Sequence, residues 1–203
     1  MSDRGKKLIL ASSSPRRREL LSEAGYQFQT DEPRLEEPTA PLRRLSPRQA
    51  AEALAYFKAR SIADGHDGEA MILGADTIVA GPGEMGVVGK PADVADARRI
   101  LQGLSGSRHA VITGVALVDA KGARRIASDV TWVTMKQLTE QELEEYIASG
   151  QWEGKAGAYG IQGRADRFVT RLEGSYSNVV GLPMELLGRL LGQPDRPGQQ
   201  DET

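Results

Sequence analysis

The sequence predicts an α/β fold, because segments with strand-like and helix-like patterns alternate along nearly all of its 203 residues. Short apolar runs at residues 7–11 and 71–74 are typical of buried strands. Apolar residues recur at helical spacing over residues 47–63 and 94–104. No repeat and no linker interrupts this mixture, so we expect one domain over residues 1–191.

The chain opens with a strand, a serine-rich loop and a helix. The strand at residues 7–11 is followed by three serines, and Ser14 is placed to cap a helix that has Pro15 at its first position. Leu20 and Leu21 give this helix an apolar side, and Gly25 marks its end. Residues 30–46 then read as an irregular loop rich in proline, glutamate and arginine.

Later elements follow from similar local signals. A capping box at Thr139 and Glu142 predicts the start of a helix that ends near Gly150. Residues 192–203 have the composition of a disordered tail. The other elements expected are a strand continuing through residues 75–80, a hairpin of strands 110–118 and 125–135, a strand at 168–172 and a last helix at 183–191.

Composition excludes several classes of function. The formal net charge of -2 argues against a general nucleic-acid binder, which carries a basic excess. The absence of cysteine excludes disulfides, thiolate catalysis and zinc–thiolate sites. The N-terminal apolar stretch is too short for a signal peptide, and no run approaches the roughly 18 residues of a membrane span. We therefore expect a soluble cytoplasmic protein with no membrane partner.

Arginines in the first turn of the N-terminal helix form the first candidate site. Arg16 and Arg17 stand where the helix dipole is positive, which is unfavourable unless an anion binds there. Backbone N–H groups, the hydroxyls of Ser12 and Ser14 and these guanidinium groups would together surround a phosphate. The alternative is an ordinary solvated basic turn, and the residues alone leave both open.

Asp76 forms the second candidate site, since it follows the apolar run at residues 71–75. Open α/β sheets bind ligands at strand ends, and a buried carboxylate there needs a metal ion or a charged partner. The alternative is a carboxylate that caps a neighbouring helix. Lysines 58, 90 and 155 stand near turn residues and are either phosphate ligands or simply exposed.

Other motifs give no site. The segment from Gly150 to Lys155 is one residue short of a P-loop and lacks the Ser/Thr after the lysine. His66 and His109 have no metal-ligand spacing and no nucleophile motif beside them. We expect Trp132 and Trp152 to be packing residues, with base stacking as the alternative.

Taken together, the segments resemble the Maf family, the septum-formation inhibitor proteins that act as nucleotide pyrophosphatases. Six pieces in order carry the resemblance: residues 10–17 (LASSSPRR), 74–79 (GADTIV), 89–91 (GKP), 112–114 (ITG), 155–163 (KAGAYGIQG) and 174–183 (GSYSNVVGLP). The resemblance implies a two-lobed mixed sheet with flanking helices, like that of inosine triphosphate pyrophosphatases, with the active-site cleft between the lobes. It also implies a divalent metal cation, Mg²⁺ or Mn²⁺, and a homodimer.

The resemblance assigns roles residue by residue. Asp76 matches the family's proton acceptor, and Arg16, Thr77 and Gln162 match positions linked to substrate choice. The residues that fall where the family lines its triphosphate site are Ser12, Ser14, Arg17, Lys58 and Lys90. Glu37 aligns with an acidic residue that helps Asp76 hold the metal. The stretch at 156–163 resembles the branch that acts on dTTP and UTP.

The chain departs from the family pattern in two places. The family often has Glu-Pro-x-Asp before the lysine, where this chain has residues 151–154 (QWEG), and Glu153 is the only acid left there. The acidic pair of the long loop is Glu36-Glu37 in place of Asp-Glu. The sequence therefore predicts hydrolysis of dTTP and UTP to the monophosphate and pyrophosphate. A 7-methyl-GTP pyrophosphatase and a non-catalytic nucleotide-binding regulator of cell division are the alternatives.

Overall fold

A computed structural model describes residues 7–33, 45–66, 69–119 and 121–192. Seven strands form one sheet in the order β2-β1-β3-β5-β6-β7, and β4 pairs with β3 beside that path. The strands are β1 (Lys7–Ala11), β2 (Phe28–Asp31), β3 (Ala70–Ala80), β4 (Val87–Val88), β5 (Arg108–Asp119), β6 (Arg124–Met135) and β7 (Val169–Glu173). The helices are α1 (Pro15–Glu23), α2 (Pro47–Ala63), α3 (Val94–Leu104), α4 (Glu140–Ala148), α5 (Tyr176–Val180) and α6 (Met184–Leu190).

The sheet is mixed, as predicted. Strand β1 pairs in parallel with β2 and β3, whereas β3, β5, β6 and β7 pair antiparallel with one another. Strand β1 ends at Ala11, opposite Gly74, but β3 continues past it to Ala80. The chain that leaves β1 therefore turns into α1 beside the second half of β3, where β1 no longer pairs with it. This difference in strand length leaves space for a site.

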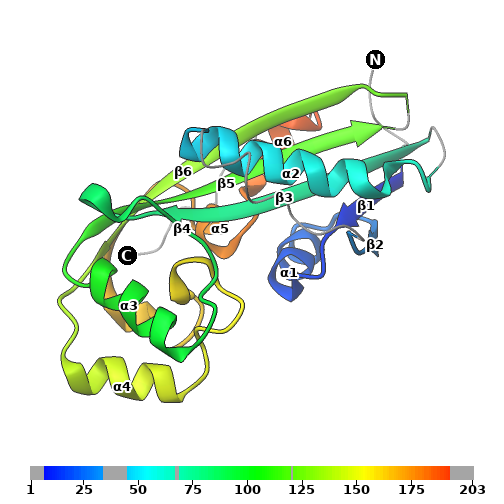
Figure 1. Ribbon diagram of the computed structural model, residues 1–203. Coiled ribbons are helices and arrows are strands. Elements are labelled where there is room, and N and C mark those ends of the chain that lie inside the picture. The colour runs from blue at the N-terminus through cyan, green and yellow to red at the C-terminus, as the bar shows by residue number, and fades with distance from the viewer. Residues whose placement is uncertain (1–6, 34–44, 67–68, 120, 193–203) are drawn as a thin grey trace.

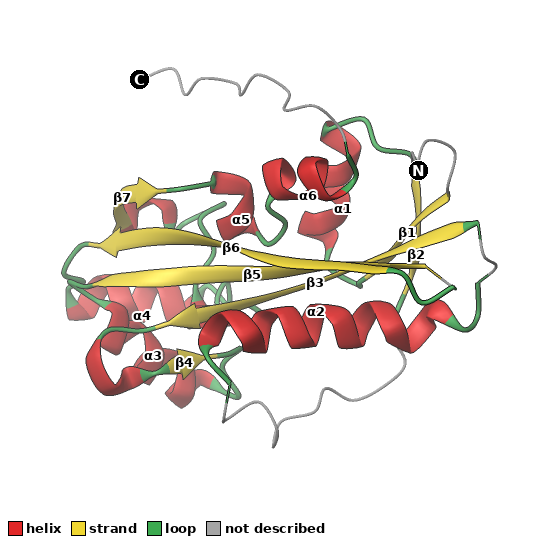
Figure 2. Ribbon diagram, turned by 90° about the horizontal axis from the view of Figure 1, so that it is seen from above, coloured by secondary structure: helices red, strands yellow, loops and turns green. Residues whose placement is uncertain are grey.

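Helices cover both faces of the sheet. Figure 2 shows α2 along one face and α1, α5 and α6 on the other. Helix α2 contacts β3 and β5 over its length, which Figure 1 shows from the side. It approaches closely because Gly74 and Gly114 face it. A Cβ built on Gly74 would lie 2.1 Å from the backbone oxygen of Ala55, and one on Gly114 would lie 2.3 Å from that of Ala51.

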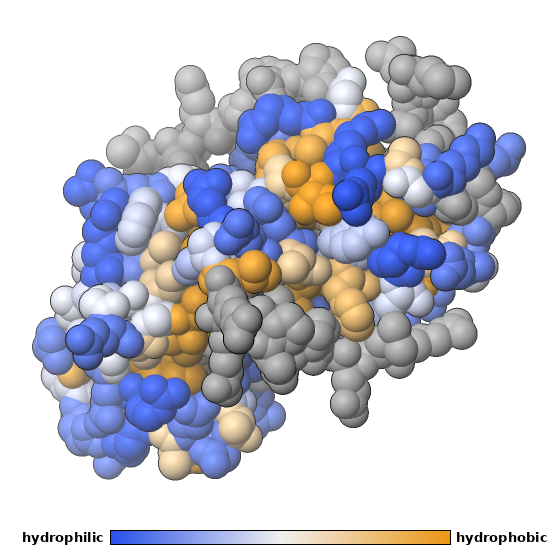
Figure 3. All heavy atoms as spheres, turned by 45° about the horizontal axis from the view of Figure 1, so that its top comes forward, coloured by the Kyte–Doolittle hydropathy of each residue, from blue (hydrophilic) through white to orange (hydrophobic). Residues whose placement is uncertain are grey.

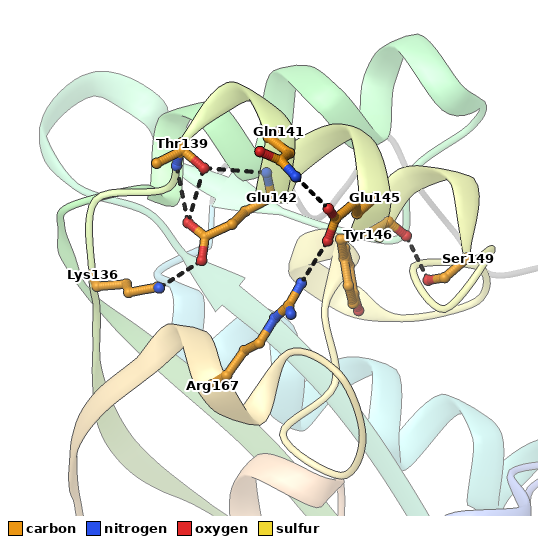
Figure 4. Close-up of polar contacts among 8 residues, drawn as sticks. All are labelled: Lys136, Thr139, Gln141, Glu142, Glu145, Tyr146, Ser149 and Arg167. Atoms are coloured by element: carbon orange, nitrogen blue, oxygen red, sulfur yellow. Dashed lines mark hydrogen bonds and ion pairs between the residues drawn. The ribbon is translucent and has the colours of Figure 1, made fainter.

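The α3–α4 end of the molecule has its own apolar core. Leu101, Leu143, Tyr146 and Phe168 are buried there in one cluster, separate from the clusters beneath α1 and α2. The capping box of α4 is present as predicted: the Thr139 side chain accepts from the N–H of Glu142. Figure 4 shows the polar contacts that hold this helix, including Lys136–Glu142 and Arg167–Glu145.

Some predictions about the backbone need correction, and others concern residues that the structure does not describe. The predicted strand does continue through residues 75–80 as part of β3, so Asp76 lies within a strand and not at the strand end where its site was expected. Strand β2, strand β4 and helix α5 were not predicted. Most of the expected loop at 30–46 and nearly all of the expected tail at 192–203 lie outside the described residues. Within the described part of the chain, no helix is long and apolar enough to cross a membrane.

Candidate active site

One cavity of about 770 Å³ lies beside the second half of β3. The loop after β1, the first turn of α1, helix α2 and the segments around residues 153–162 and 179–181 contribute to its wall. Every predicted site residue within the described part of the chain lines this cavity: Ser12, Ser14, Arg16, Arg17, Lys58, Asp76, Thr77, Lys90 and Gln162. Glu37 lies outside the described residues. Residues up to 150 positions apart in sequence are thus brought to one place, while their roles stay predictions.

Asp76 and Lys58 form a buried ion pair in this cavity. Each residue is 8% exposed, and the Lys58 ammonium donates to Oδ1 of Asp76. A buried carboxylate needs such a partner, since an uncompensated charge would be strongly unfavourable. Oδ2 of Asp76 forms no hydrogen bond with any described residue. One carboxylate oxygen is therefore left for a water molecule or a cation, and Asp76 does not cap a helix.

All three guanidinium nitrogen atoms of Arg17 donate hydrogen bonds to other residues of the cavity wall. Nε donates to the carbonyl oxygen of Gly181 at 2.8 Å, while the two terminal nitrogens donate to Ser12 Oγ at 3.1 Å and Thr77 Oγ1 at 3.3 Å. Ser12 Oγ also accepts from the N–H of Ser14 at 3.2 Å, which shapes the loop entering α1. Arg17 thus ties α1 to β3 and to the turn after α5, and brings positive charge to the cavity.

A buried polar network behind Thr77 was missed by sequence reasoning. The hydroxyls of Thr77 and Thr113 share a hydrogen bond of 2.9 Å, and Thr113 donates to the carbonyl oxygen of Asn178 at 2.9 Å. The Asn178 amide in turn donates to Val111 O at 3.0 Å and to Thr131 Oγ1 at 2.9 Å. A threonine in the otherwise apolar run 110–118 was the available signal, since strand interiors rarely bury an unpaired hydroxyl. The network fixes Thr77 against the cavity.

One side of the cavity is apolar. Val79, Val111 and Val179 line it together with the ring of Tyr159. His109 Nε2 lies 2.7 Å from the Tyr159 hydroxyl, and burial lowers the pKa of His109 to about 4. The histidine is therefore neutral at physiological pH and holds the tyrosine ring in place. The cavity wall thus combines charged groups with an apolar part.

The two tryptophans lie in different surroundings, and neither lines the cavity. Trp152 is buried, with its indole N–H donating to Ile147 O at 3.1 Å, so its predicted packing role is confirmed. Trp132 is 40% exposed on β6, where the Arg108 guanidinium lies 4.2 Å from its ring centre. The packing prediction was wrong for Trp132, because β6 turns this side chain to the surface.

The acidic residues of the cavity limit how a metal could bind. Among the described residues, Asp76 and Glu153 are the acids that line it, and no group of three or more His, Asp or Glu residues could hold a metal ion by itself. Mg²⁺ commonly takes one or two carboxylates and completes its shell with water and substrate phosphates. The available oxygen of Asp76 fits such a shared site and does not fit a site built by protein ligands alone.

Comparison with known proteins gives matches over most of the chain. The Maf-like protein family matches residues 7–193. A dTTP/UTP pyrophosphatase of Vibrio cholerae is 49% identical over 91% of this chain and 96% of its own length. A dTTP/UTP pyrophosphatase of Alkaliphilus metalliredigens is 46% identical over 91% of this chain and 94% of its own.

The similarity to a solved structure is lower in sequence identity and covers a smaller part of this chain. A nucleoside-triphosphatase, dITP/XTP pyrophosphatase, of Mycobacterium abscessus is 19% identical, with a TM-score of 0.41, over 65% of this chain and 75% of that one. The fold class rests on the sheet described above, and the family rests on the sequence matches. The chain belongs to the Maf-like protein family.

Proposed function

We propose that this protein hydrolyses dTTP and UTP to the nucleoside monophosphate and pyrophosphate. The observation that carries the proposal is the convergence of Asp76 with lysine and arginine side chains on one cavity. An anion sensor has little use for a buried carboxylate facing phosphates, whereas a hydrolase needs a base there. The names of the two relatives, at 46–49% identity over most of the chain, support the same reaction.

Asp76 acts as the general base in this proposal. Its Oδ1 is held by Lys58, and Oδ2 accepts a proton from a water molecule. The oxygen of that water bonds to the α-phosphorus, and the bond from this phosphorus to the bridging α–β oxygen breaks. The electron pair leaves on pyrophosphate. No covalent intermediate with the protein forms, so catalysis consists of positioning and charge stabilisation.

A divalent cation fits beside Asp76. We propose that Mg²⁺ or Mn²⁺ is held by Asp76, by Glu37 and by substrate phosphates, and when bound it supplies Lewis-acid polarisation of the phosphate. The cationic residues Arg16, Arg17 and Lys90 oppose the charge of the triphosphate from the cavity wall. Ser12 and Ser14 line the same cavity, and the Ser14 N–H donates to Ser12 Oγ, which shapes the loop beside the proposed anion.

Gln162 is the proposed reader of the base. It is exposed and lines the cavity. Its amide offers a donor for O4 and an acceptor for N3–H of uracil or thymine, and when it is held in this orientation it mismatches cytosine. Thr77, held by Thr113 and Arg17, is the second position proposed to affect substrate choice.

Replacing Gln162 with leucine is expected to lower the preference for UTP over CTP by about tenfold or more. The expectation follows because leucine has no polar group with which to distinguish the two edges. The measurement is kcat/KM for both nucleotides in the variant and in Gln141→Leu, a matched change on exposed α4. An unchanged ratio of kcat/KM in Gln162→Leu would exclude Gln162 as the base reader.

The reaction itself is tested by pyrophosphate release from a panel of canonical and modified nucleoside triphosphates, with Mg²⁺ and with Mn²⁺. Selective hydrolysis of dTTP and UTP is the expected result. Preferential hydrolysis of 7-methyl-GTP would contradict the dTTP/UTP assignment and identify the protein as a 7-methyl-GTP pyrophosphatase. Binding without turnover on any nucleotide would contradict the proposal and favour a regulator.

The oligomeric state, the cellular location and the two-lobed organisation of this protein are proposals drawn from the family resemblance. We propose a homodimer in the cytoplasm, with residues 1–191 forming one two-lobed domain. The separate apolar clusters at the α3–α4 end and beneath α1 and α2 support the two lobes. Among the described residues, the large hydrophobic side chains that are exposed are Leu45, Val87, Val94, Trp132 and Tyr176. On the face shown in Figure 3, hydrophilic residues border the apolar areas.

A further inference from the structure

Lys155 and Arg16 lie side by side in the cavity although they are 139 positions apart in sequence. Both side chains pack against the bare α-carbon of Gly160. A Cβ built there would lie 2.8 Å from both Cδ and Cε of Lys155 and 3.3 Å from a terminal nitrogen of Arg16. Glycine at this position therefore lets two cations share one part of the wall.

Neither cation has a carboxylate at salt-bridge distance among the described residues, and the charges of Glu153 and Glu19 only partly offset the effect of burial on their pKa values. Within the described ranges, neither Lys155 nor Arg16 forms a salt bridge. The Lys155 ammonium donates to the carbonyl oxygen of Gln151, which also accepts from the Tyr146 hydroxyl at 3.3 Å. Burial lowers the pKa of both side chains, and the charge of Arg16 lowers that of Lys155 further.

Two adjacent cations held in this way are stabilised by an anion that binds between them. Elsewhere in the cavity, Lys58 is already paired with the carboxylate of Asp76, so its charge is largely balanced. Of the two products of the proposed reaction, pyrophosphate carries more negative charge than the phosphate ester of the monophosphate. The surplus positive charge at Arg16 and Lys155 thus matches the leaving group.

We propose that Lys155, seated on Gly160 beside Arg16, binds the pyrophosphate portion of the substrate and receives it as the leaving group. The inference rests on the proposed function for the identity of its ligand. When the bond to the α-phosphorus breaks, the electron pair moves to the bridging oxygen of pyrophosphate, and the two cations oppose this added charge. Lys155 is therefore a substrate-binding residue in addition to those named above.

The test is calorimetric binding of pyrophosphate and, separately, of dTMP, at a fixed Mg²⁺ concentration. Lys155→Met removes the charge, and Lys121→Met is its control on an exposed turn lysine. Gly160→Ala keeps the charge but displaces the lysine side chain. Gly160 is not among the glycines with positive φ, so alanine fits its backbone. Gly188→Ala is the matched control, because nothing lies within 4 Å of the added Cβ.

We expect Lys155→Met to weaken pyrophosphate binding by about tenfold or more, as for loss of a hydrogen bond to a charged group. Gly160→Ala should weaken it by a smaller factor, with dTMP binding within about twofold of wild type in both variants. Unchanged pyrophosphate binding in both variants, or equal weakening of dTMP, would overturn the proposal. If the protein hydrolyses no nucleotide, the proposed function is contradicted. Pyrophosphate binding that still depends on Lys155 would then support the anion-binding role of Lys155 by itself.

Discussion

Asp76→Asn is expected to lower turnover of dTTP by about 10²–10⁴-fold, the range found for loss of a general base. The amide keeps the size of the carboxylate and can still accept a hydrogen bond from Lys58, but it cannot take the proton from water. Nucleotide binding should persist, because the arginines and lysines that line the cavity remain.

The measurement pairs pyrophosphate release with calorimetric binding of dTTP to the same variant. Asp166→Asn is the control, since it removes the same charge from an exposed position outside the cavity. Thermal unfolding shows whether the variant is folded. This control is needed because asparagine leaves the buried charge of Lys58 without its carboxylate partner, which destabilises the fold. Full turnover in a folded Asp76→Asn protein would remove this residue from the mechanism.

Gly114→Ala is expected to lower the free energy of unfolding by about 3 kcal/mol, at the upper end for overpacking. The added Cβ would lie 2.3 Å from both C and O of Ala51 and 2.6 Å from N of Glu52. All three are backbone atoms of α2, so no side-chain rotation relieves the overlap and the helix itself must move. That movement would also carry Lys58 away from Asp76, and turnover should fall with stability.

Urea unfolding measures this change, with Gly188→Ala as the control. Gly188 lies in α6 with open space around it, so alanine there should be neutral or slightly stabilising. An unfolding free energy for Gly114→Ala within about 0.5 kcal/mol of wild type would show that α2 does not depend on this close approach.

Local chemistry explains why so much of the fold was predictable. The bounds of α2 and α3 agree with the predicted ranges, because their apolar spacing lies within the helices and their capping residues directly adjoin them. The antiparallel pairing of β5 with β6 was likewise predicted from two adjacent strand-like stretches. Strand β2 was missed because Gln29, Thr30 and Asp31 give no apolar signal, and it forms through backbone pairing with β1.

Tertiary contacts changed the roles inferred for several residues that the sequence analysis had singled out. The arginine cluster looked like one phosphate-binding unit, but Arg17 donates to protein acceptors that only folding brings together, and Arg18 donates to Ser13 O at 3.0 Å. Lys155 could not be told from an exposed lysine until Gly160 and Arg16 were placed beside it. In each case the deciding neighbour lies on another element.

The sequence by itself determined the α/β class and most element boundaries, since motifs and periodicity are local properties. Its resemblance to the Maf family indicated the set of residues that converge on the cavity. Only the tertiary structure decided that β1 stops pairing with β3 before Asp76, that Lys58 reaches Asp76 from α2, and that Arg16 and Lys155 share a wall. These features depend on how closely elements pack and on which charges are balanced. Both are set by contacts between residues that are distant in the chain.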